Sequence, residues 1–109
     1  MDATILIVDD DAMVRNVIEQ LLQRKGYKIK GVGSAREAIE YLKANRVDLV
    51  VSDIVMPEMN GYELLQVIKK SFPHIGVIMM TGYGDANSVK EALTLGADEY
   101  ITKPFKGQE

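Results

Sequence analysis

Residues 5–11 read Ile5-Leu6-Ile7-Val8-Asp9-Asp10-Asp11, an apolar run followed by three aspartates. A second apolar run, Leu49-Val50-Val51-Ser52, ends at Asp53. Short apolar runs bounded by turn residues are typical of strands buried on both faces of a parallel sheet. Carboxylates at the ends of such strands repel one another and lose hydration unless something offsets their charge. All-oxygen ligands suit Mg²⁺ or Ca²⁺, so the pattern predicts a divalent-cation site.

The chain has 109 residues, a net charge of −3 and no cysteine. This length fits one compact domain, residues 1–109. The negative charge argues against a direct nucleic-acid or anionic-membrane partner. Without cysteine there is no disulfide, thiolate metal site or cysteine nucleophile, and a reducing cytoplasm is the expected location. The longest apolar runs have four residues, too few for a membrane span or the core of a signal peptide.

Strand-like and helix-like segments alternate along the whole chain, which predicts an α/β fold with a parallel sheet. The expected strands are residues 4–8, 27–32, 48–53, 75–80 and 98–102. The expected helices are residues 12–25, a helix opened by a Ser34–Glu37 capping box, and residues 61–71 and 86–95. The second and fifth strands carry charged residues and belong at the edges of the sheet. With right-handed crossovers this gives a doubly wound, flavodoxin-like order, 2-1-3-4-5.

Helical spacing predicts which side chains face the core. In the first helix the expected buried stripe is Val14, Val17, Ile18, Leu21 and Leu22, and in the fourth it is Val89, Ala92 and Leu93. Asp11 is expected to be the N-cap of the first helix, because Asp9 and Asp10 already occupy the strand end. His74 has no partner histidine or cysteine and is expected to be exposed to solvent.

Ligands of doubly wound folds bind beyond the carboxyl ends of the strands. The residues at those ends are Asp9, Asp10, Asp53, Thr81 and Lys103. Phosphoryl transfer needs mainly positioning and neutralisation of charge. A cation held by the carboxylates, together with a hydroxyl and an ammonium group, would supply both. A carboxylate can itself be the nucleophile and form an aspartyl phosphate.

The chain closely resembles the receiver domain of two-component response regulators over residues 4–105. The resemblance is carried by the segments Ile5–Asp11, Ser52–Gly61, Met80–Gly84 and Gly96–Phe105, in that order along the chain. It implies that Asp53 accepts a phosphoryl group from a histidine kinase or a phosphotransfer protein. It also implies a signalling phospho-acceptor, not an enzyme acting on other substrates, with its effector domain or target protein outside this chain.

The resemblance further implies a role for each site residue. Mg²⁺ would be bound by Asp10 directly, by Asp9 mainly through water, by Asp53 and by the main-chain carbonyl of Val55. Thr81 and Lys103 would contact the phosphoryl oxygens.

Tyr100 would be an aromatic switch residue that moves with Thr81, although an edge-strand aromatic packed against the fourth helix is the alternative. The Lys103-Pro104 bond resembles the family's cis peptide. The resemblance also implies that Val55 and Tyr83 occupy positions that tune dephosphorylation. Because the apolar Val55 cannot orient a water molecule, we expect slow self-hydrolysis.

Acidic residues at strand ends also occur in proteins of other functions. A phosphatase of the haloacid dehalogenase type needs a second aspartate where this chain has Val55. A flavin binder needs a hydroxyl- and glycine-rich loop where this chain has three aspartates. A receiver-like interaction module that is not phosphorylated stays open as the alternative.

After Phe105 only Lys106-Gly107-Gln108-Glu109 remain, so the last helix of a receiver is missing or barely begun. Apolar side chains of the central strands and of the fifth strand would then face water. The expected explanations are a chain trimmed from a longer regulator, a homodimer that covers this face, or both.

Overall fold

The computed structural model describes residues 3–81 and 86–102. These residues form a parallel sheet of five strands with the order β2-β1-β3-β4-β5, as predicted from the sequence. The strands are β1 (Thr4–Val8), β2 (Lys28–Val32), β3 (Leu49–Asp53), β4 (Gly76–Thr81) and β5 (Glu99–Thr102). The helices are α1 (Ala12–Gln23), α2 (Ala35–Ala44), α3 (Gly61–Ser71) and α4 (Ala86–Thr94). None of the helices in the described part of the chain is long and apolar enough to cross a membrane.

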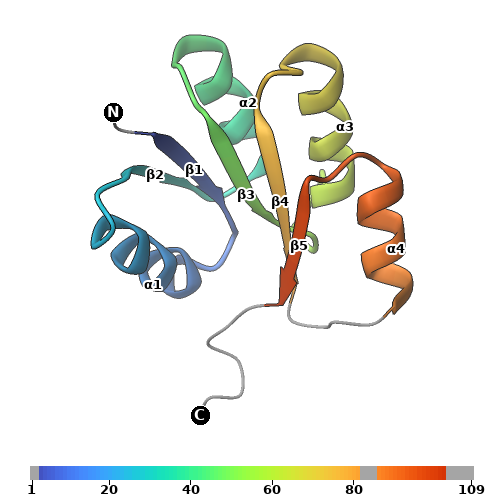
Figure 1. Ribbon diagram of the computed structural model, residues 1–109, viewed down its shortest axis with the longest axis horizontal. Coiled ribbons are helices and arrows are strands. Elements are labelled where there is room, and N and C mark those ends of the chain that lie inside the picture. Colours follow the sequence, from blue (N-terminus) through green and yellow to red (C-terminus); the bar gives the residue numbers. More distant parts are fainter. Residues whose placement is uncertain (1–2, 82–85, 103–109) are drawn as a thin grey trace.

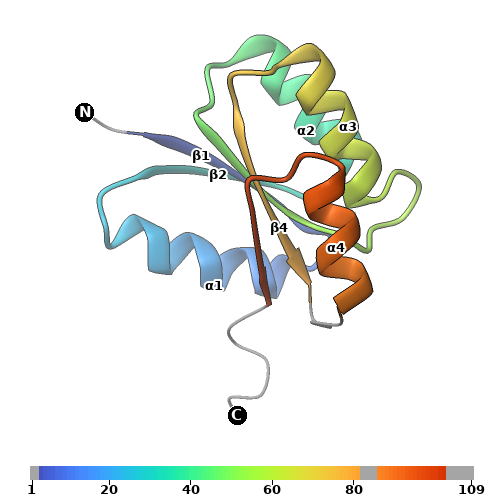
Figure 2. The same ribbon diagram turned by 45° about the vertical axis from the view of Figure 1, so that its right-hand side comes forward.

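The helices lie on both faces of the sheet (Figures 1 and 2). On one face, α2, α3 and α4 cover a large core in which Leu6, Val50 and Val77 are fully buried. On the other face, α1 covers a smaller core that contains Ile7, Val51 and Met80. Because successive residues of a strand point to opposite faces, the apolar runs of β1, β3 and β4 supply both cores.

An apolar groove of about 340 Å³ lies beside α1 on the less covered face of the sheet. Its lining includes side chains from α1, from the central strands and from β5, namely Leu21, Leu22, Val51, Ile78, Met80 and Ile101. Among the described residues α1 is the one helix on this face. The predicted exposure of apolar strand side chains is confirmed for Ile101 of β5, which is 39% exposed, but not for Val51 and Met80 of the central strands, which are buried.

The groove also corrects a prediction. Leu21 was expected in the buried stripe of α1, but it is 46% exposed because it lies at the groove, where nothing in the described chain covers it. Leu93 was likewise expected to face inward and is 50% exposed. Its neighbour Ala92 points into the core, and the next position is turned about 100° away from it. The side chain of Val89, also expected to face inward, lies outside the described residues.

The helix starts agree with the sequence except in one detail. Asp11 is the N-cap of α1, as predicted, and its side chain accepts hydrogen bonds from the main-chain N–H groups of Met13 and Val14. Ser34 caps α2, but Glu37 accepts from the N–H of Gly33 and not from that of Ser34, so the predicted capping box is only half formed.

The start of α3 and the end of α1 each show a feature that was not predicted from the sequence. A complete capping box, which sequence reasoning did not identify, opens α3 between Asn60 and Glu63. Helix α1 ends at Gln23, before the predicted residue 25, and Gly26 follows with a φ of 91° that favours glycine.

Candidate functional site

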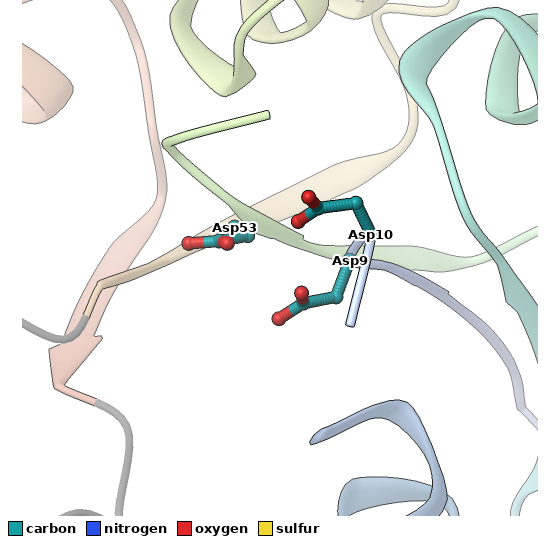
Figure 3. Close-up of side chains that lie close together, drawn as sticks. All are labelled: Asp9, Asp10 and Asp53. Atoms are coloured by element: carbon teal, nitrogen blue, oxygen red, sulfur yellow. The ribbon is translucent and has the colours of Figure 1, made fainter. Parts of the chain in front are cut away.

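Three of the aspartates expected at the strand ends lie together. Asp9 and Asp10 follow β1, Asp53 ends β3, and one carboxylate oxygen from each lies within 4.8 Å of the others. Figure 3 shows the three side chains projecting from the ends of the two neighbouring strands. The register explains the arrangement, because Val8 pairs with Ser52 and the next residue of each strand is an aspartate. Asp9 and Asp53 are buried, whereas Asp10 is exposed.

The surroundings of Asp53 hold its carboxylate in one orientation. The main-chain N–H of Ile54 donates to Asp53 Oδ1 over 2.8 Å. The same N–H lies 3.1 Å from the carbonyl oxygen of Met80, which joins this turn to β4. Ser52, a buried polar residue in an apolar strand, donates its hydroxyl to the main-chain oxygen of Asp53 over 2.9 Å. The carboxylate of Asp53 is therefore buried at the end of β3, where the hydroxyl of Ser52 and the main-chain N–H of Ile54 already have hydrogen-bond partners.

Asp9 is held by its backbone as well as by its side chain. Its N–H donates to the carbonyl oxygen of Val32, and its Oδ1 accepts from the N–H of Asp11 over 2.9 Å. Its main-chain oxygen accepts a hydrogen bond of 2.7 Å from Nη1 of Arg15. Sequence reasoning did not single out Arg15. The signal was its place one helical turn after the aspartate run, which alone does not distinguish it from a surface arginine.

The three carboxylates fit a divalent cation with oxygen ligands. Mg²⁺ binds oxygens at about 2.1 Å, so two ligands on opposite sides of the ion lie about 4.2 Å apart. The observed limit of 4.8 Å between ligand atoms is close to this span. Residues Asp9, Asp10 and Asp53 are the ones that would hold the ion.

The structure describes the other predicted site residues to different extents. Thr81 is the last residue of β4 and pairs with Thr102 of β5, but its side chain is not among those described. Tyr100 is half-buried and packs against the larger core, as the packing alternative requires, while its switch role stays a prediction. Val55 is 67% exposed on the loop after β3. Lys103, Tyr83 and the Lys103-Pro104 bond lie outside the described residues.

The loop between β3 and α3 packs tightly behind Asp53. The N–H of Gly61 donates to the carbonyl oxygen of Ile54 over 2.8 Å and closes the loop. In the same loop Glu58 has a φ of 68°, a conformation that costs roughly 1–2 kcal/mol for a residue with a side chain. The loop is thus bent sharply enough to bring the start of α3 against the end of β3.

A charged pair lies at the other end of the strands, near the starts of β4 and β5, and is separate from this site. Asp98 Oδ2 accepts from the N–H of Val77 over 2.8 Å and from Nζ of Lys69 over 3.0 Å. The hydrogen bond from Val77 and the ammonium group of Lys69 hold the pKa of Asp98 below its usual value of 3.8. His74 is exposed, as predicted.

Comparison with known proteins agrees with this geometry. A family model described as the response regulator receiver domain matches residues 5–109. The DNA-binding transcriptional regulator NtrC of Rhizobium meliloti (strain 1021) is 40% identical over 103 residues, which cover 94% of this chain and 21% of the relative. Response regulator SaeR of Staphylococcus aureus (strain USA300) is 38% identical over 105 residues, which cover 96% of this chain and 46% of the relative.

Solved structures show the same likeness. The chemotaxis protein CheY4 of Vibrio cholerae matches with a TM-score of 0.90 at 28% identity, over 96% of this chain and 89% of that one. The chain spans less than half the length of the curated relatives named above. A family match over nearly the whole sequence, together with the strand order and the aspartates at the strand ends, leaves one conclusion: this chain belongs to the family of response regulator receiver domains.

Proposed function

We propose that this receiver domain accepts a phosphoryl group on Asp53 from a histidine kinase or a phosphotransfer protein, and that the reaction depends on Mg²⁺. The observation that carries the proposal is the position of Asp53. It is 5% exposed at the end of a central strand, yet it lies within 4.8 Å of two other carboxylates. Three carboxylates placed so closely favour binding of a cation, and an oriented carboxylate beside a bound cation suits transfer of a phosphoryl group.

The proposed reaction uses the hydrogen bond that Asp53 receives. Because the N–H of Ile54 donates to Oδ1, the carboxylate is oriented, and one of its oxygens is proposed as the nucleophile. The bond from this carboxylate oxygen to phosphorus forms as the P–N bond of the donor's phosphohistidine breaks, and the electron pair of that bond returns to the imidazole. When bound, Mg²⁺ offsets the charge of the carboxylates and of the phosphoryl oxygens.

Thr81 and Lys103 are proposed to contact the phosphoryl oxygens, and Tyr100 to respond to phosphorylation. The register supports Thr81, because it follows Met80, the residue of β4 that pairs with Asp53. Tyr100 lies on the neighbouring strand β5 and pairs with Met79. A shift of the end of β4 toward a phosphoryl group would therefore reach β5 directly, and an effector outside this chain would read the change.

The test is incubation with acetyl phosphate, with and without Mg²⁺, followed by intact-mass measurement. The expected result is a Mg²⁺-dependent gain of one phosphoryl group, which hydroxylamine removes because the product is an acyl phosphate. The variant Asp53→Asn is expected to remain unmodified. The matched control is Asp48→Asn, which removes a carboxylate of the same type before β3, where it accepts from the N–H of Thr4.

The outcomes separate the two readings of the family resemblance. A mass gain that persists in Asp53→Asn would place the phosphoryl group on another residue and contradict the proposal. If no modification occurs while Mg²⁺ is present, the chain is the receiver-like interaction module that is not phosphorylated.

A further inference from the structure

We propose that Arg15 is a positioning residue for the cation site, because it fixes the peptide group that joins Asp9 to Asp10. This inference rests on the proposed function, since it concerns Mg²⁺ binding by those two aspartates. Nη1 of Arg15 donates to the main-chain oxygen of Asp9 over 2.7 Å. That oxygen belongs to the peptide that joins the two ligands, so the hydrogen bond restrains ψ of Asp9 and φ of Asp10.

Arg15 reaches this oxygen across the end of β2, where the chain has glycines at alternate positions. A Cβ on Gly33 would lie 3.3 Å from Nη1 of Arg15. A Cβ on Gly31 would lie 3.4 Å from Cδ of Arg15 and would overlap the carboxylate of Glu19. Residues two apart on a strand share one face, so the two glycines leave space for the arginine side chain on the α1 side of the strand.

The other bonds at this peptide show what Arg15 adds. The N–H of Asp9 is tied to Val32, and the N–H of Asp11 is tied to Asp9 Oδ1. These bonds fix the start of the turn and its far end. The bond from Arg15 fixes the carbonyl in between, and without it the peptide can rotate to take its hydrogen bond from water. Loss of this restraint leaves the main chain of Asp10, the exposed ligand, less ordered before the ion binds.

The sign of the effect distinguishes positioning from simple charge. A guanidinium beside a cation site repels the cation, so removal of its charge alone tightens Mg²⁺ binding. Loss of positioning weakens Mg²⁺ binding, because the ligands must be ordered when the ion binds. Groups that orient metal ligands typically contribute roughly tenfold or more to metal affinity. The two explanations for an effect of Arg15 therefore predict opposite changes in the dissociation constant.

The experiment is calorimetric titration of Mg²⁺ into the unmodified protein and into Arg15→Met, Arg15→Lys and Arg24→Met, at constant ionic strength. Arg15→Met is expected to raise the dissociation constant roughly tenfold. Arg15→Lys keeps the charge and a donor and should recover part of the affinity. Arg24→Met makes the same charge change at the exposed end of α1 and should leave the affinity unchanged or slightly tighter. Unfolding in urea without Mg²⁺ measures stability separately.

A second variant displaces the arginine without removing it. In Gly33→Val the added side chain occupies the space beside Nη1, so Mg²⁺ affinity should fall although every charge is retained. In the double variant with Arg15→Met the two losses should not add, because both remove the same contact.

If Arg15→Met binds Mg²⁺ as tightly as the unmodified protein, or more tightly, the inference is overturned. If the unmodified protein itself does not bind Mg²⁺, the proposed function falls first and the inference with it.

Discussion

Gly61 and Asp53 are in contact through their main chains: a Cβ added to Gly61 would overlap the carbonyl oxygen of Asp53. It would also lie 2.8 Å from Cα of Ile54 and 2.8 Å from Cε of Met79. The first turn of α3 thus presses against the end of the strand that carries the proposed phospho-acceptor. A glycine is required here for space, since its φ does not lie in the left-handed region.

We predict that Gly61→Ala destabilises the fold and lowers the rate of phosphorylation together. Overpacking of a close contact costs typically 1–3 kcal/mol, and the backbone shift that relieves it moves Asp53. The free energy of unfolding in urea and the rate of modification by acetyl phosphate measure the two effects. The matched control is Gly76→Ala at the start of β4, where the added Cβ would meet a leucine side chain at 3.2 Å. Full activity of Gly61→Ala would show that the contact does not position Asp53.

Asp98 makes the stability of the fold depend on acid pH. Its pKa is lowered in the folded state, so its contribution is present above the unfolded-state value of 3.8 and is lost as the pH falls through the folded-state pKa. We predict that Asp98→Ala costs about 1 kcal/mol near neutral pH, a modest value because its side chain is 55% exposed. Below the folded-state pKa the variant and the unmodified protein should unfold alike. A constant difference at every pH would contradict this account.

Asp11 differs in role from its two neighbours in the aspartate run, and substitution should reveal the difference. We predict that Asp11→Ala lowers the free energy of unfolding by about 1 kcal/mol, because α1 loses its N-cap. Asp11→Ser keeps a capping oxygen and should be close to neutral. Mg²⁺ affinity should change little in both variants, since the bond to Asp9 comes from the main-chain N–H of residue 11. By contrast, Asp10→Asn should weaken Mg²⁺ binding.

Val55 is an exposed apolar residue two positions after the buried Asp53. We predict slow self-hydrolysis of the phosphoryl group on Asp53. An apolar side chain cannot hydrogen-bond the attacking water. Val55→Gln supplies such a group, and one hydrogen bond of about 1 kcal/mol shortens the phosphoryl lifetime about fivefold. Val55→Leu is the matched control. The lifetime is followed by intact mass after the donor is removed, and a lifetime of seconds in the unmodified protein would refute the prediction.

The groove beside α1 leads to a prediction about association. We predict that copies of this chain pair through it, because its lining is almost entirely apolar and Leu21 is half-exposed at its edge. Leu21→Glu should convert the dimer to a monomer in sedimentation equilibrium. Leu93→Glu places the same charge on an equally exposed leucine outside the groove and should not. A mass of one chain for the unmodified protein at high concentration would rule the pairing out.

The strand order was predictable because it follows from composition and chirality. The apolar runs of β1, β3 and β4 had to be central, and Lys28 and Lys30 marked β2 as an edge. The meeting of Asp9, Asp10 and Asp53 followed from that order, since neighbouring parallel strands end at the same edge. These inferences needed the properties of whole segments and not the details of side-chain contacts.

The failures share a different cause. Helical spacing gave the direction of Leu21 but did not tell whether an element lies opposite it. Glu37 accepts a hydrogen bond from the N–H of Gly33 and not from that of Ser34, and the local sequence pattern does not distinguish these two donors. Arg15 reaches Asp9 through space left by two glycines at the end of β2, Gly31 and Gly33. In each case the outcome depends on what lies nearby in three dimensions, and the one-dimensional pattern does not carry that information.

The register of β1 and β3 has a consequence for ion size. Because Val8 pairs with Ser52, the two aspartates that follow stand on adjacent strands at the same level. Adjacent strands lie about 4.8 Å apart, a distance set by main-chain hydrogen bonds and common to all sheets. The separation between the carboxylates of Asp9 and Asp53 is thus inherited from the peptide backbone. Substitution of core side chains can therefore lower the free energy of unfolding without changing the radius of the cation that the site prefers.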